Sequence, residues 1–141
     1  MDGSTRTYLT ADYVAGFFDG EGCIHVGYGR GYLQKKISVS NIRPEVLDMI
    51  REHFGFGSVL YSGTPRWQVS DTLDIITCLE ALLPYLVVKK QQVVLMLELC
   101  RLSNTKYSRP QLTEEQHVRQ AELMAQISAL NIKGRRSVQY D

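Results

Sequence analysis

The stretch VAGFFDGEGCI, residues 14 to 24, decides the fold of this chain. Its first half has the apolar composition of a buried helix, yet Gly16 lies inside that helix and the Glu21 carboxylate stands between two glycines. An interior glycine costs a helix about 1 kcal/mol relative to alanine, so we expect a compensating contact. Gly16 and Gly20 are four residues apart and share one face of the helix. This spacing predicts the close approach of a second helix.

A second copy of the chain is the natural source of that helix, with the contact on a two-fold axis. Two Glu21 carboxylates about 6 Å apart repel by about 3 kcal/mol at an effective dielectric near 20 and therefore attract cations. Hard divalent ions bind carboxylate and phosphate oxygens, and such sites promote phosphodiester displacement. The alternative is that the flanking glycines form a turn and Glu21 is a solvated loop acid. The predicted dimer interface comprises Ala15, Gly16, Asp19 and Gly20.

Hydrophobic periodicity divides the chain into helices and hairpins. Thr10 can cap a first helix over residues 11 to 19, which Gly20 or Gly22 ends in a left-handed conformation. The alternation that starts at Cys23 predicts a strand with Cys23 inward and His25 outward, and this arrangement argues against a zinc site. The later expected elements are a glycine-rich connection over 27 to 32, a strand over 33 to 40, a helix from Pro44 to Gly55, a hairpin turning at 63 to 65, a helix over 72 to 83 capped by Asp71 and Asp74, a helix over 87 to 102, and a helix capped by Thr113 and Gln116 that ends near Asn131.

This order predicts an α+β fold of one domain, residues 1 to 141, with a basic C-terminal tail over 131 to 141. Two hairpins separated by helices favour one four-stranded antiparallel sheet with helices on a single face. The other face is then open. Its predicted outward residues mostly donate hydrogen bonds and suit the DNA major groove, although any solvated sheet face is polar. These residues are His25, Gln34, Lys36, Ser38, Ser40, Arg66, Gln68 and Ser70.

The bulk composition bounds the class of protein. The 141 residues carry 16 Lys and Arg against 15 Asp and Glu, a formal charge of +1, so a nucleic-acid partner must be met by local patches. The start of the chain resembles no secretion signal, and no apolar stretch is long enough to span a bilayer. Three widely spaced cysteines suit reduced thiols. We expect a soluble intracellular protein, in the cytoplasm or, if organelle-encoded, in the matrix or stroma.

The segment VAGFFDGEG, residues 14 to 22, resembles the nonapeptide of the LAGLIDADG homing endonucleases. It matches the Ala-Gly pair, the first acid at Asp19, the second acid at Glu21 and the last glycine. LPYLVVKKQQ at 83 to 92 and SALNIKGRR at 128 to 136 resemble stretches of the single-motif members. The resemblance implies the αββαββα homing-endonuclease fold, with a saddle-shaped sheet.

The resemblance also implies an activity. Single-motif members are homodimeric, intron-encoded enzymes that hydrolyse both strands of a long pseudopalindromic duplex with Mg²⁺ or Mn²⁺. Glu21 would bind the metal, Gly20 would add its carbonyl, and Asp19 would be a helix-end hydrogen-bonding residue. Lys89 would be the active-site lysine, with Lys90 as its competitor. Asn41 would position water, with Arg43 assisting it.

Further basic residues extend the expected DNA contacts. Arg30, in the first hairpin, and the tail residues Lys133, Arg135 and Arg136 are candidate contacts to the DNA backbone, and Lys106 and Arg109 lie in a loop that could reach phosphate. Three other readings stay open: an RNA-binding intron maturase, a catalytically inactive DNA-binding regulator on the same fold, and, more distantly, a small-molecule-binding domain. In the maturase case the partner would be intron RNA.

Overall fold

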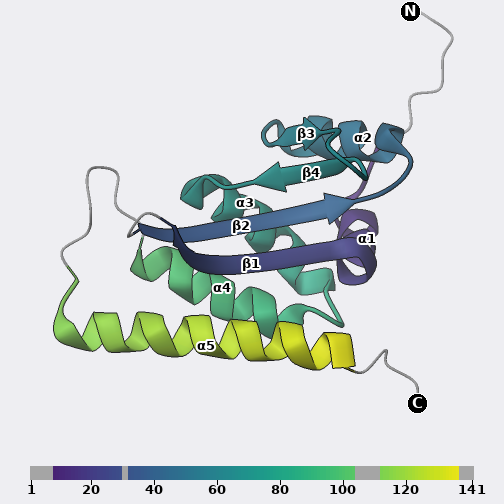
Figure 1. The fold of residues 1–141 in the computed structure, drawn as a ribbon. Helices are drawn as coiled ribbons and strands as arrows, with labels where there is room; N and C mark the ends of the chain where they lie inside the picture. Colours follow the sequence, from purple (N-terminus) through teal and green to yellow (C-terminus); the bar gives the residue numbers. More distant parts are fainter. Residues whose placement is uncertain (1–7, 30–31, 104–111, 137–141) are drawn as a thin grey trace, which may run out of the picture.

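A four-stranded antiparallel sheet forms the centre of the computed structural model, which describes residues 8–29, 32–103 and 112–136 (Figure 1). The strands lie in the order β1-β2-β4-β3, so the two hairpins meet at the neighbouring strands β2 and β4. The antiparallel four-stranded sheet predicted from the sequence is confirmed. The strands are β1 Gly22–Gly29, β2 Tyr32–Ser40, β3 Ser58–Leu60 and β4 Arg66–Val69.

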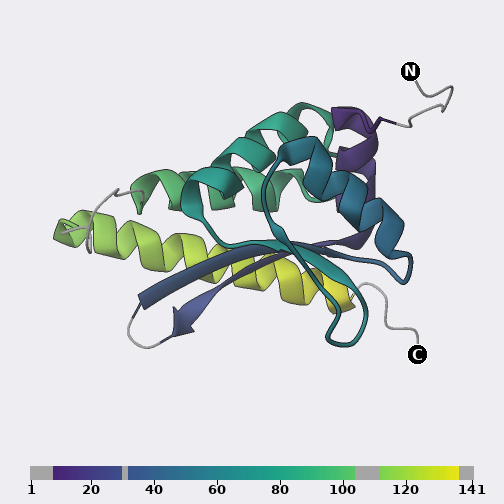
Figure 2. The ribbon, with the colours of Figure 1, turned by 90° about the horizontal axis from the view of Figure 1, so that it is seen from above.

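Helices α1 to α4 cover one side of the sheet, and no described helix covers the other side, which is called the uncovered face below (Figure 2). Ile24, Ile37 and Val69 occupy one row across three strands and face the helices, which bury them. The apolar faces of the helices complete this core. The helical elements are α1 Ala11–Glu21, α2 Pro44–Phe54, α3 Thr72–Leu82, the 3₁₀ turn η1 Leu83–Tyr85, α4 Lys90–Leu102 and α5 Glu114–Arg136.

Helix α5 runs beside α4 and the outer edge of β1 (Figure 1). Thr113 and Gln116 form the predicted reciprocal cap, in which each side chain accepts the backbone N–H of the other residue. Arg119 binds Glu98 of α4 through two hydrogen bonds of 2.6 and 2.8 Å. The Asn131 amide donates to the Ile24 carbonyl over 2.9 Å, so α5 binds the edge of the sheet directly.

The expected helix ends are confirmed at two places. Pro44 begins α2, and Gly55 ends it with a φ of 80°, a left-handed conformation that favours glycine. The Asp71 carboxylate accepts the Asp74 N–H over 3.0 Å and caps α3. Pro84 lies in the 3₁₀ turn that follows α3.

The junction between α1 and β1 differs from the sequence prediction. Helix α1 continues through Gly20 to Glu21, and Gly22 is extended, with a φ of −76° and a ψ of 156°. Neither glycine is left-handed, because β1 begins at Gly22 and pairs at once with Val39, which leaves no room for a turn. The carboxylate between the glycines is therefore the last residue of the helix.

Three other boundaries also differ. Gly27, Tyr28 and Gly29 belong to β1 because their pairing with β2 overrides the weak strand preference of glycine. Helix α4 begins at Lys90, three residues later than expected, and α5 continues beyond Asn131 to Arg136.

The direction of Cys23 was predicted wrongly. Cys23 is exposed and lies on the same face as His25, as the two-residue period of a strand requires. Cys78 and Cys100 are buried, and burial raises the pKa of their thiols to about 12 and about 11. These two buried thiols are therefore protonated and unreactive near neutral pH.

Candidate active site and nucleic-acid interface

The Asp19 carboxylate joins the end of α1 to the segment that precedes α4. One oxygen, Oδ2, accepts the backbone N–H of Val87 over 2.8 Å. The other, Oδ1, accepts those of Val88 and Lys89 over 3.1 and 2.9 Å. Asp19 is therefore a helix-end hydrogen-bonding residue, as expected. These three bonds fix the position of residues 87 to 89 against the end of α1.

The Lys89 side chain returns to the same helix end. Its ammonium donates to the Asp19 carbonyl over 2.8 Å and is partly buried. A cation at a helix C-terminus is stabilised by the carbonyl groups that lack partners there. Lys90 is exposed at the start of α4 and makes no hydrogen bond or ion pair with a described residue. Of the two candidate lysines, the geometry brings Lys89 to the end of α1.

Glu21 is exposed and follows directly on this helix end. Within residues 8–29, 32–103 and 112–136 its carboxylate makes no hydrogen bond or ion pair, and no group of three or more His, Cys, Asp or Glu side chains could hold a metal. A single carboxylate with nearby carbonyl oxygen fits Mg²⁺, which keeps several waters and is usually held by one or two carboxylates together with substrate phosphates. The donors of one chain fit such an ion and leave room for other ligands.

One face of α1 is open to solvent. Gly16 and Gly20 are exposed, and a Cβ atom added at either position would meet nothing within 4 Å. Asp19 lies half-buried beside this face. Ala15 does not belong to the face: it is 0% exposed because it packs into the core of its own subunit beside Val14 and Phe18.

The Asn41 side chain is engaged locally. Its Oδ1 accepts the backbone N–H of Arg43 over 2.8 Å, and the backbone N–H of Asn41 donates to the Pro65 carbonyl over 3.1 Å. Asn41 and Arg43 line a cavity of about 710 Å³ between α1 and α2, with Tyr13 and Phe17 on the wall. No hydrogen bond joins Asn41 to Glu21 or Lys89 among the residues that the structure describes.

The strand pairing sets residues that were predicted to face outward opposite one another. His25 pairs with Lys36, Ser38 with Gln68, and Ser40 with Arg66. Ser38 lies between the side chains of two neighbouring strands and is only 7% exposed, so it presents little surface to a ligand. Ser70 is exposed one residue beyond the end of β4.

The charge and hydrogen-bonding state of this face favour an anionic, polar partner. None of the four strands contains Asp or Glu. Arg66 Nε and Gln68 Oε1 are buried atoms that have no hydrogen-bond partner within the part of the chain that the structure describes. Lys36 and Arg66 lie on this face and its strands carry no carboxylate, so its charge suits an anionic ligand.

Several residues predicted to contact DNA lie outside the part of the chain whose side chains the structure describes. Arg30, Lys106 and Arg109 lie outside the described residues. Lys133, Arg135 and Arg136 belong to α5, whose side chains are described only as far as Asn131.

Lys35 is a residue that the sequence reasoning missed. It occupies an inward position of β2, opposite the buried Val26, where the alternation calls for an apolar side chain. That break in the pattern was the available signal. Burial lowers the pKa of its ammonium.

Comparison with known proteins identifies relatives. A family model described as a LAGLIDADG-like domain matches residues 9–86. The structure is similar to that of the homing endonuclease I-CvuI in complex with its target in the presence of Ca, with 26% identity, a TM-score of 0.72, and coverage of 85% of this chain and 80% of that chain. No curated protein matched the chain in a separate comparison.

Two more distant structures share the fold. The archaeal intron-encoded homing endonuclease I-Vdi141I, complexed with DNA, has 23% identity, a TM-score of 0.70, and coverage of 85% of this chain and 82% of that one. I-SmaMI bound to cleaved DNA has 22% identity and a TM-score of 0.72, and the match covers 98% of this chain and 52% of that one. The present chain thus spans about half the length of I-SmaMI. No described helix is long and apolar enough to cross a membrane.

Proposed function

This chain belongs to the LAGLIDADG homing endonuclease family, and from that premise we propose that it is an intron-encoded, homodimeric endonuclease that hydrolyses both strands of a long pseudopalindromic DNA duplex with Mg²⁺ or Mn²⁺. The observation that carries the proposal is the bond between the Lys89 ammonium and the Asp19 carbonyl. It holds a cation two residues from the exposed Glu21 carboxylate. An acid and a lysine at one end of an acid-free sheet suit chemistry on a phosphodiester.

The roles follow from the charges. Glu21 would hold the divalent ion, and the Gly20 carbonyl would assist. When bound, this ion would stabilise charge on the attacking and leaving oxygens. Lys89 would stabilise the charge that develops on the phosphate, or orient the attacking water. Asn41 would position that water through its amide NH₂, because its oxygen already accepts the Arg43 N–H.

The uncovered sheet face would read the DNA. Lys36 and Arg66 would supply positive charge. His25, Gln34, Gln68, Ser40 and Ser70 would supply hydrogen bonds to base edges and phosphates, whereas the buried Ser38 would contribute little. Related structures contain DNA targets: I-CvuI was solved with its target in the presence of Ca, and with the I-CreI target in the presence of Mg, where the DNA was not cleaved. Basic residues of α5 would add backbone contacts, namely Lys133, Arg135 and Arg136.

The direct test is cleavage of a random duplex library by the purified protein with Mg²⁺, Mn²⁺ or excess chelator. We expect double-strand breaks at one sequence class that disappear with the chelator. Tight duplex binding without metal-stimulated cleavage would instead indicate an inactive DNA-binding regulator. Preference for intron RNA over duplex DNA would indicate a maturase.

The dimer is tested separately at Gly16. Gly16→Gln is expected to weaken dimerisation by about 100-fold or more, roughly 2.7 kcal/mol, because a long side chain separates helices that meet through small residues. The subunit should fold normally, since an added Cβ meets nothing within 4 Å. Sedimentation equilibrium measures the dissociation constant, and circular dichroism checks the fold.

Ala81→Gln is the matched control because Ala81 is an exposed small residue on a different helix, α3. It should leave dimerisation and cleavage unchanged. A Gly16→Gln protein that dimerises as tightly as wild type would place the interface elsewhere.

A further inference from the structure

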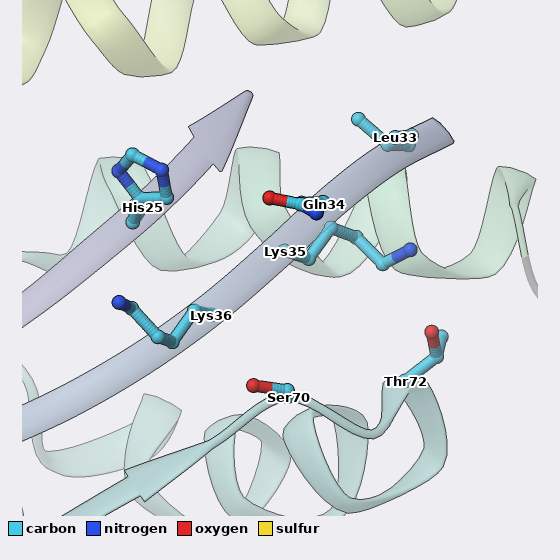
Figure 3. A pocket seen from close by; sticks show the side chains of 7 residues that line it. All are labelled: His25, Leu33, Gln34, Lys35, Lys36, Ser70 and Thr72. Atoms are coloured by element: carbon cyan, nitrogen blue, oxygen red, sulfur yellow. The ribbon is translucent and has the colours of Figure 1, made fainter. Parts of the chain in front are cut away.

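A basic pocket lies where β4 ends before β2 does. The last paired residue of β4 is Val69, opposite Ile37, so the residues of β2 on the hairpin side of Ile37 have no β4 partner. The chain turns away there through Ser70 into α3. The gap forms a pocket of about 420 Å³ (Figure 3). It is lined by His25, Leu33, Gln34, Lys35, Lys36, Ser70 and Thr72.

Two lysines reach this pocket from opposite sides of one strand. Lys36 lies on the uncovered face, where it pairs with His25. Lys35 starts from the helix-covered side and extends toward the turn that carries Ser70 and Thr72 (Figure 3). Consecutive residues of a strand point to opposite faces, so only a gap at the strand edge lets both line one pocket.

The Lys35 ammonium has no counter-ion among the described residues. It is half-buried, and no carboxylate of the described chain forms an ion pair with it. Its electrostatic neighbour is the buried Cys100 thiol, which is neutral near pH 7 because its pKa is raised to about 11. A partly desolvated cation without a partner costs free energy, which a bound anion would offset.

The other lining groups complete the donor set. Gln34 offers an amide, Ser70 and Thr72 offer hydroxyls, and no acid of the described segments lines the pocket. The nearby Asp71 carboxylate is used in capping α3. Ammonium, amide and hydroxyl donors around one cavity suit a tetrahedral oxyanion with several acceptor oxygens.

We propose that this pocket binds a backbone phosphate of the DNA duplex, held between Lys35 and Lys36. This proposal rests on the proposed function. It adds a DNA contact at Lys35, a residue that the strand pattern assigns to the buried side of the sheet. DNA is the source of the phosphate because His25 and Lys36 belong both to the pocket and to the uncovered face, so a duplex on that face passes the mouth of the pocket. Phosphate contacts fix the register of a protein on DNA without reading sequence.

The test measures duplex affinity for Lys35→Met as a function of salt. We expect about 10-fold weaker binding at physiological salt for cognate and unrelated duplexes alike, and a salt slope reduced by about 0.9. Met retains most of the apolar stem and removes an unpaired cation, so the variant should be as stable as wild type. Lys35→Arg should keep most of the affinity. The control Arg51→Gln removes an exposed cation of α2 and should change neither quantity.

Two further measurements test whether the pocket binds DNA phosphate. Addition of duplex to the wild-type protein should shift the NMR signal of the Lys35 ammonium, a result that does not depend on any variant. Titration with inorganic phosphate alone should show only weak binding. Tight phosphate binding that duplex does not displace would indicate a site for small anions and would overturn the proposal.

Wild-type protein that fails to bind any duplex refutes the proposed function. Normal duplex binding with unchanged affinity and salt slope in Lys35→Met refutes this pocket alone.

Discussion

Glu21→Gln is expected to reduce the rate of DNA cleavage by on the order of 1,000-fold, which corresponds to an activation barrier raised by roughly 4 kcal/mol. This is the upper end of the range for the loss of one electrostatic contact to a transition state. The substitution keeps the shape of the side chain and removes the charge that would hold the divalent ion. Because Glu21 is exposed and has no partner among the described residues, the fold should not change. Single-turnover cleavage of a cognate duplex in Mg²⁺ measures the effect.

Duplex binding separates catalysis from recognition. Glu21→Gln should bind the cognate duplex within about threefold of wild type, since the sheet that contacts DNA is unaltered. Glu52→Gln is the control because Glu52 is an exposed helical acid of α2, and it should cleave at the wild-type rate. Undiminished cleavage by Glu21→Gln would remove this carboxylate from the metal site.

Asp19→Ala is expected to lower the free energy of unfolding by about 3 kcal/mol. A hydrogen bond to a charged group contributes about 1.5–3 kcal/mol, and the Asp19 carboxylate makes three, but these bonds are partly exposed to solvent and each contributes less than that. Three backbone N–H groups, of Val87, Val88 and Lys89, lose their acceptor. Residues 87 to 89 should then detach from α1 and carry the Lys89 ammonium away from Glu21. Cleavage should fall even at temperatures where the variant is folded. Urea denaturation measures the first effect, and single-turnover kinetics the second.

Asp71→Ala provides the comparison for a single cap. Asp71 accepts one N–H at the start of α3, and its loss should cost about 1 kcal/mol without altering cleavage chemistry. Equal destabilisation of the two variants, with full activity in Asp19→Ala, would show that Asp19 does not position Lys89.

Much of the fold was predictable because it depends on local patterns. The alternation around Ile24, Ile37 and Val69 predicts which faces of the strands are buried, and one face of the sheet then has to be open. Pro44 and Gly55 mark the ends of α2 for the same local reasons. The position of Glu21 beside the sheet follows from the helix-to-strand junction.

The failures have a common physical cause, which is that tertiary pairing overrides local preference. Gly22 is extended rather than left-handed because Val39 pairs with it. The bonds from Asp19 to residues 87 to 89 join segments about 70 positions apart, and no spacing within either segment indicates them. Family resemblance pointed to Lys89, whereas residue patterns alone left it as one of two exposed lysines. Lys35 escaped notice because a strand pattern does not reveal where a neighbouring strand stops.

Helix α5 has a consequence for how copies of this chain can associate. Strands at the margins of a sheet are templates on which a foreign strand can add, which leads to swapped or fibrous assemblies. In this protein the Ile24 carbonyl of the edge strand β1 already accepts a hydrogen bond from Asn131, and the other edge strand, β3, is only three residues long. Both edges are poor templates for an added strand, which protects the protein against polymerising through its backbone.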